Sequence, residues 1–137
     1  MVRPEVLQRR LRKLDEYLEI LRRLRRYHFE EFIQDPERYG SAERFLQLAI
    51  EALLDMGNHV IADLGLGEVR WYSDIPAILA ERAGLEPELK EKWIRMIGFR
   101  NILVHEYMEV DRRIVYEILQ TGLEDLERLR RFFAAFL

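Results

Sequence analysis

The sequence contains no cysteine, only four prolines and seven glycines, and no long apolar run. The absence of cysteine excludes disulfides and zinc sites built from thiolates. No stretch approaches the roughly 18 apolar residues of a membrane-spanning helix, and the first five residues lack the apolar segment of a secretion signal. We therefore expect a protein of the cytoplasm that has no membrane partner.

The composition is that of a folded, helix-rich protein. Of its 137 residues, 49% are hydrophobic and 34% are charged. This length suits one domain, residues 1–137, with a core of its own. The net charge of −3 argues against tight, sequence-independent binding to a long duplex, which needs many phosphate contacts. It leaves room for brief contact with a short single strand.

Apolar residues recur at spacings of three and four along most of the chain, and no window alternates with a period of two. The pattern predicts five helices, over residues 4 to about 33, 41–65, 73–84, 87 to about 105, and 111–136. The first helix carries the clearest seam, formed by Leu7, Leu11, Leu14, Leu18 and Leu21. We expect an all-α, antiparallel helical bundle with short connections.

Two further features of the helices bear on partners. Basic runs at 9–13 and 22–26 either guide RNA or form a solvated face, and the neighbouring glutamates favour the solvated face. Gly57 and Gly122 lie within predicted helices, where a missing side chain permits close approach. Together with the long seams, these glycines lead us to expect a homodimer.

Residues 98–107 hold a compact polar group within a stretch that otherwise has the pattern of a buried helix. Arg100 projects with the apolar stripe, although a permanent charge is costly there unless it is paired or faces a cleft. His105 lies about 140° further around an ideal helix, so the two side chains do not converge if the helix is straight. Either the helix ends or bends near His105, or a second copy of the chain supplies the partner group.

A fixed cation beside a proton-transfer group is suited to cleavage of a phosphodiester. The 2′-hydroxyl of RNA would attack the adjacent phosphorus, with His105 as base or acid and Arg100 neutralising the developing charge. The alternative is a purely structural network of Arg100 and His105 with Asn101 capping the helix end. His105, Glu109 and Asp111 form a weak candidate for a metal site, and we expect neither a metal nor another cofactor.

The segment from Arg100 through Asn101 and His105 to Tyr107 resembles the R-x4-H-x-Y motif of HepT-like toxins, a branch of the HEPN superfamily. The similarity extends through residues 55–62, 65–67, 92–99 and 109–119. The resemblance implies a dimeric helical bundle with composite, metal-independent ribonuclease sites at the dimer interface. It also implies a partner, an MNT-type nucleotidyltransferase antitoxin, which neutralises the toxin by nucleotidylating the motif tyrosine.

Carried onto this sequence, the resemblance makes Arg100 and His105 catalytic, Asn101 an assisting residue and Tyr107 the site of modification by AMP. Asn58 and His59 fall in the similar region and are candidate assisting residues, and a paired core or interface histidine is the alternative for His59. Two other functions remain open. One is a binding module that docks a nucleotidyltransferase without cleaving RNA, and the other is a structural dimerisation domain.

Overall fold

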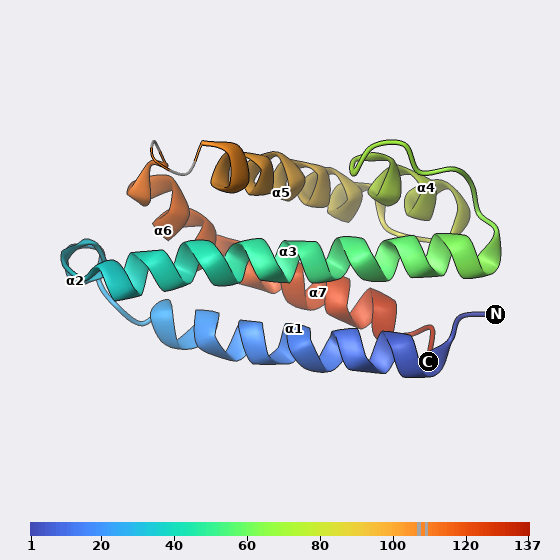
Figure 1. Ribbon diagram of the computed structural model, residues 1–137, viewed down its shortest axis with the longest axis horizontal. Coiled ribbons are helices and arrows are strands. Elements are labelled where there is room, and N and C mark those ends of the chain that lie inside the picture. The colour runs from blue at the N-terminus through green and yellow to red at the C-terminus, as the bar shows by residue number, and fades with distance from the viewer. Residues whose placement is uncertain (107, 109) are drawn as a thin grey trace.

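The computed structural model describes residues 1–106, 108 and 110–137, and this part of the chain contains helices and no strands (Figure 1). The helices are α1 (Pro4–Leu24), α2 (Phe29–Gln34), α3 (Pro36–Leu64), α4 (Asp74–Arg82), α5 (Pro87–His105), α6 (Arg112–Thr121) and α7 (Leu123–Ala134). The all-α prediction is confirmed. The described residues form seven helices rather than the five expected.

The long helix α3 is the centre of the bundle. It packs against α1, α4, α5, α6 and α7, and α2 crosses one of its ends. Figure 1 shows α1 and α5 on opposite sides of α3, with α7 running behind it and both termini at the end away from α2. The candidate motif therefore lies on a helix that is held directly against the central one.

The first expected helix is interrupted between Leu24 and Phe29. The carbonyls released at this break accept hydrogen bonds from α6: Tyr116 Oη donates to the carbonyl of Tyr27 at 2.8 Å, and Gln120 Nε2 donates to the carbonyl of Arg25 at 2.9 Å. The expectation of one helix to residue 33 was wrong because side chains about 90 residues away stabilise the break. Neither proline nor glycine marks it in the sequence.

The other differences involve Asp35 and Gly122. Asp35 caps α3 by accepting the backbone N–H of Glu37, so the Asp35–Pro36 pair begins this helix five residues before the expected start at Ser41. Gly122 separates α6 from α7, and a Cβ at this position would lie 2.8 Å from the carbonyl oxygen of Ile118. The single helix expected over residues 111–136 is therefore two helices, α6 and α7.

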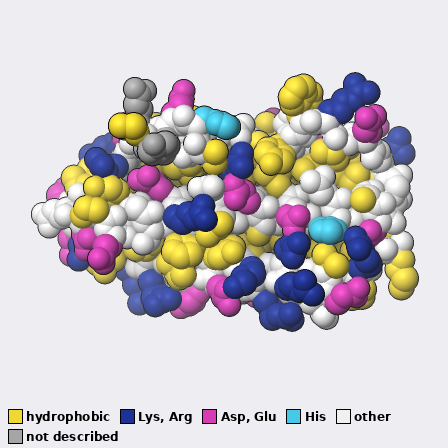
Figure 2. All heavy atoms as spheres, in the orientation of Figure 1, with side chains coloured by type: hydrophobic (Ala, Val, Ile, Leu, Met, Phe, Trp, Pro, Cys, Tyr) yellow, Lys and Arg dark blue, Asp and Glu magenta, His cyan; other side chains and the backbone are white. Residues whose placement is uncertain are grey.

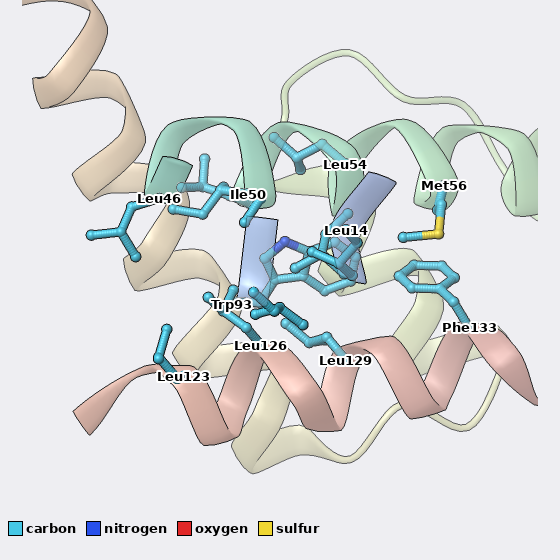
Figure 3. Packing of buried hydrophobic residues seen from close by; sticks show 14 of the residues in the cluster. Leu14, Leu46, Ile50, Leu54, Met56, Trp93, Leu123, Leu126, Leu129 and Phe133 are labelled. Atoms are coloured by element: carbon cyan, nitrogen blue, oxygen red, sulfur yellow. The ribbon is translucent and has the colours of Figure 1, made fainter. Parts of the chain in front are cut away.

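The predicted leucine seam of α1 is confirmed, because all five leucines are buried. Trp93 of α5 is fully buried in the middle of the bundle, and its ring meets that of Phe133 edge-on at 5.8 Å. Figure 3 shows Trp93 among Leu14, Ile50, Leu126 and Leu129, which come from three other helices. Burial of such a large side chain fixes α5 against the core two turns before the polar motif begins.

Both glycines offered in support of a dimer are used within the chain. A Cβ on Gly57 would overlap Ile75 of α4 and touch Trp93, so this glycine permits α3 and α4 to pack closely. Gly122 lies at the junction between α6 and α7, where a Cβ would press against the backbone of Ile118. These positions and the leucine seams therefore give no support to dimerisation, which remains a prediction from the motif and the resemblance.

The basic runs of α1 lie among acidic side chains. Arg10 pairs with Asp55 of α3, and Arg22 pairs with Glu127 of α7 at 3.1 Å. Figure 2 shows the Lys and Arg side chains along this side of the molecule interspersed with Asp and Glu. The arrangement agrees with a solvated, ion-paired face. In the described part of the chain, no helix combines the length and apolar character needed to cross a bilayer.

Candidate active site

Arg100 points toward α3, as the helix angles predicted, and it is paired there with a carboxylate. Its Nε and Nη2 atoms donate to Oε2 of Glu51 at 3.0 and 2.8 Å, and its Nη1 donates to Oδ1 of Asn101 at 3.2 Å. The Arg100 side chain is 13% exposed. The pairing explains how a permanent cation is accommodated next to the apolar stripe.

An aromatic ring completes the surroundings of this cation. The guanidinium carbon of Arg100 lies 5.1 Å from the ring centroid of Tyr72, which precedes α4. A guanidinium has five N–H donors, and the three hydrogen bonds to Glu51 and Asn101 leave one donor on each terminal nitrogen among the described contacts. Arg100 is thus held in one orientation with two donors available.

These residues line a hollow of about 300 Å³, here called the Arg100 pocket, whose lining consists of Glu51, Leu54, Asp55, Asn58, Tyr72 and Arg100. Glu51, Asp55 and Asn58 are spaced by four and three residues and so share one face of α3. The structure therefore brings Asn58, a predicted assisting residue, to Arg100. Glu51 and Tyr72 are pocket residues that sequence reasoning missed.

His59 lies outside the Arg100 pocket, in a polar network at the start of α1. Its Nδ1 atom is 3.2 Å from Nη2 of Arg3, and its Nε2 atom is 3.9 Å from Oδ1 of Asp55. Arg3 also donates to Asp63, and these hydrogen bonds hold the pKa of the Asp63 carboxyl below its ordinary value. These contacts favour the alternative of a paired histidine, and among the described residues Asp55 connects it to the pocket.

His105 is the last residue of α5 and is exposed. Glu106 leaves the helical conformation, and its N–H still donates to the carbonyl of Ile102 at 2.8 Å. This outcome matches one of the two alternatives drawn from the helix angles. Among the polar contacts of the described residues, none joins His105 to Arg100.

Two residues of the motif region lie outside the described residues. They are Tyr107, the predicted site of modification, and Glu109, a member of the weak metal candidate with His105 and Asp111. Both interpretations stay predictions. In the remainder of the chain, no group of three or more His, Cys, Asp or Glu side chains is placed to hold a metal ion.

Comparison with known proteins identifies the family. The model of the family described as ribonuclease HepT-like matches residues 14–132. The chain belongs to the HepT-like ribonuclease family. The family resemblance inferred from the motif is therefore confirmed.

Individual relatives and structures agree with this assignment. This HepT-like chain is 28% identical over 125 residues to the tRNA nuclease HepT of Aphanizomenon flos-aquae, covering 90% of this chain and 84% of the relative. It is 34% identical over 98 residues to the mRNA nuclease HepT of Shewanella oneidensis, covering 72% and 74%. The tri-AMPylated Shewanella oneidensis HEPN toxin, solved in complex with its MNT antitoxin, superposes with a TM-score of 0.89 at 26% identity over 97% of this chain and 99% of that one.

Proposed function

We propose that this HepT-like chain is the toxin of a HEPN/MNT toxin–antitoxin system, a metal-independent endoribonuclease with a composite site of Arg100 and His105 in a homodimer. The observation that carries the proposal is the state of Arg100, a cation fixed by Glu51 and Tyr72 that keeps one donor on each terminal nitrogen. The names of the relatives support RNA as the substrate. We also propose the cytoplasm as the place where the chain acts.

In this mechanism the 2′-hydroxyl of a ribose attacks the adjacent phosphorus in line with the departing 5′-oxygen. The bond from O2′ to phosphorus forms while the bond from phosphorus to O5′ breaks, giving a 2′,3′-cyclic phosphate and a 5′-hydroxyl. A histidine removes the proton from the 2′-hydroxyl, and a protonated histidine supplies one to O5′. The two donors left on Arg100 suit two non-bridging oxygens of one phosphate, whose charge grows in the transition state.

The position of His105 explains why we propose a second copy of the chain. His105 is exposed at the end of α5, and Arg100 is directed toward α3 in the same protomer. A twofold axis near the end of α5 would place His105 of each copy close to the Arg100 pocket of the other, or the two histidines opposite one another. The second arrangement provides both a base and an acid at one phosphate, whereas the first provides one histidine for each Arg100 pocket. Sedimentation at micromolar concentration tests the assembly, and a strictly monomeric chain would exclude the composite site.

The decisive experiment for the activity uses single-stranded RNA in the presence of EDTA. We expect cleavage to continue and the new ends to carry 2′,3′-cyclic phosphate, because Arg100 and His105 supply both the charge and the proton transfers. The ends are identified by mass spectrometry of the fragments. A strict requirement for a divalent ion, or 3′-hydroxyl products, would contradict the mechanism.

We further propose an MNT-type nucleotidyltransferase as the partner that silences the site by adding AMP to Tyr107. The tyrosine oxygen would attack the α-phosphorus of ATP, pyrophosphate would leave, and the phenolic proton would pass to a base of the partner. The similarity to an AMPylated toxin in complex with an MNT antitoxin supports this. The phosphate added at Tyr107, two residues from His105, would pair with Arg100 and so exclude the phosphate of RNA. Intact mass after incubation with the antitoxin and ATP tests the idea, and Tyr107→Phe should stay unmodified and active.

One observation favours a second candidate function, a binding module that docks the nucleotidyltransferase without cleaving RNA. Arg100 already has Glu51 as a counter-ion, as a purely structural arginine would. The two functions differ in whether the chain cleaves RNA. Purified chain free of antitoxin that binds the nucleotidyltransferase but leaves RNA intact over hours would establish the docking function.

A further inference from the structure

A second hollow shares Tyr72 with the Arg100 pocket. It has a volume of about 340 Å³ and is bounded by Trp71, Tyr72 and Ser73 ahead of α4, and by a face of α5 that includes Gly98 and Asn101. We call it the Trp71 pocket. Tyr72 lines both hollows, and Asn101 lines this one while accepting a hydrogen bond from Arg100. A molecule in the Trp71 pocket would therefore lie next to the cation.

The walls of this pocket are unusually exposed aromatic rings. Trp71 is 73% exposed and Tyr72 is 45% exposed, whereas Trp93, the other tryptophan, is completely buried. Large aromatic side chains contribute strongly to the core when buried, so this exposure is not explained by folding. The Tyr72 ring is already oriented by the guanidinium of Arg100 at 5.1 Å. The Tyr72 ring is therefore held in place as a stacking surface for a flat ligand.

The floor of the pocket is apolar and open. Ile94 and Ile97 contribute aliphatic surface, and Gly98 lies between them and the motif. A Cβ added to Gly98 would meet no atom within 4 Å. Close packing within the protomer therefore does not require glycine at position 98. The missing side chain leaves this part of the pocket free of protein atoms.

We propose that the Trp71 pocket binds a nucleobase of single-stranded RNA, from a nucleotide next to the phosphate held by Arg100. This inference rests on the proposed ribonuclease function and deepens it. Single-stranded RNA is bound by aromatic side chains that stack on unpaired bases, with polar groups beside them that contact the base edge. Here Trp71 and Tyr72 provide the stacking surfaces, and the amide of Asn101 and the hydroxyl of Ser73 lie beside them.

The adjacent charge favours a nucleotide over another protein surface. A base stacked beside Tyr72 has its phosphate within reach of Arg100, and each terminal nitrogen of Arg100 keeps one donor for that phosphate. An apolar side chain from a second copy would leave those donors unused. Duplex RNA would not fit, because its bases are already stacked and paired.

Intrinsic fluorescence gives a direct test, since Trp71 is exposed and Trp93 is buried. A non-self-complementary RNA decamer is titrated into the His105→Ala variant, so that the strand is not consumed. We expect saturable quenching that disappears in His105→Ala with Trp71→Phe added. Binding detected by anisotropy of a labelled decamer without any quenching of Trp71 would overturn the proposal. Quenching with RNA that the wild-type chain never cleaves would retain the pocket and refute the ribonuclease function.

A second test fills the pocket. Gly98→Leu places a side chain in open space, and Gly40→Leu makes the same change at another helical glycine with no atom within 4 Å of a Cβ. We expect Gly98→Leu to raise KM for the RNA by about tenfold or more with kcat largely retained, as expected for the loss of one stacked base. Gly40→Leu should leave KM unchanged. Equal KM values for Gly98→Leu and wild type would refute base binding.

The same variants test whether a second copy of the chain, rather than a nucleobase, covers the Trp71 pocket. If the surface is instead an interface between copies of the chain, Gly98→Leu and Trp71→Ala would lower the apparent mass in sedimentation, and Trp71 fluorescence would change with protein concentration in the absence of RNA. That result would replace the nucleobase by a second copy of the chain. With the mass unchanged, Trp71→Phe should restore most of the affinity that Trp71→Ala loses, because phenylalanine keeps a stacking face.

Discussion

Arg100 and Arg128 are both paired across helices and both border a hollow of about 300 Å³, yet their surroundings differ. Arg128 of α7 donates four hydrogen bonds to three carboxylates, those of Glu86, Glu88 and Asp125. Arg100 has one carboxylate partner and an aromatic ring. Hydrogen bonds to Glu88, followed by the charges of the nearby carboxylates, raise the pKa of Arg128. Hydrogen bonds from Arg128 and Lys92 lower the pKa of Glu88 to about 2.

The difference shows how a structural arginine is distinguished from a candidate catalytic one. A hollow beside the guanidinium does not separate them. The two arginines are distinguished by how many donors each leaves unused and how many carboxylates surround it. A substrate phosphate needs free donors and is repelled by excess negative charge. The three carboxylates around Arg128 would repel a phosphate, whereas Arg100 keeps a donor on each terminal nitrogen.

The largest expected effect extends this comparison to the two histidines of the α3–α5 region. His105→Ala should lower the rate of RNA cleavage by about 10²- to 10⁴-fold, because it removes a proton-transfer group. His59→Ala should retain most of the activity, since His59 itself lies outside the pocket and contacts Arg3 and the pocket residue Asp55. Single-turnover cleavage assays measure both. Equal losses in the two variants would mean that His59 belongs to the site.

The arginine comparison itself gives the next effect. Arg100→Ala should lower cleavage by about 10²- to 10³-fold, the size expected for loss of a group that stabilises developing charge. Arg128→Ala should leave the cleavage rate within a few-fold of wild type. Circular dichroism checks that both variants keep their helices. A large loss of activity in Arg128→Ala with intact folding would break the distinction between the two arginines.

A smaller effect is expected on stability at Gly57, which allows α4 to approach α3. Gly57→Ala should overpack against Ile75 and cost about 1–3 kcal/mol, only partly offset by about 1 kcal/mol of improved helix propensity. Gly40→Ala, at an open position in the same helix, should instead stabilise the protein slightly. Thermal melting compares the two. An unchanged or higher melting temperature for Gly57→Ala would show that α4 moves freely.

The smallest effect concerns the carboxylates around Arg128. The pKa of Glu88 falls from its ordinary 4.5 to about 2 in the folded chain, so its contribution is present above pH 4.5 and is lost as pH falls toward 2. The Glu88 side chain is more than half exposed, so the loss should be modest. Urea unfolding at pH 5 and pH 3 measures it. Glu88→Gln should unfold with a shallower pH dependence, and an identical dependence would show that the ion pair contributes nothing to stability.

The helical class, the α1 seam, the direction of Arg100 and the end of α5 could all be predicted from the sequence, because each depends on local spacing. The break after Leu24 could not, since the side chains that bind its carbonyls are 89 and 95 residues distant. Glu51 is 49 residues from Arg100 in the sequence. A signal for it existed, however, in the spacing of Glu51, Asp55 and Asn58 along one face of a helix.

Tyr72 was harder to find. It belongs to the connection between α3 and α4, residues 65–73, which has no helical spacing to fix the direction of its side chains. The only local signal was a pair of adjacent aromatic residues, Trp71 and Tyr72, directly before the Ser73–Asp74 helix start. Aromatic residues outside a helical stripe have no core face to occupy, and this is a reason to examine them as binding residues.

The bonds from Tyr116 and Gln120 to the end of α1, with those from Arg130 to Asp15 across 115 residues, have a consequence for the order of events during synthesis. The first helix acquires its proper end and its last neighbour only after the C-terminal helices have left the ribosome. Trp93 likewise gains its partner Phe133 only then. A growing chain that already contains Arg100 and His105 therefore lacks the part of the frame of α5 that α7 supplies, and we expect the nascent chain to leave RNA near the ribosome uncut until its synthesis is complete.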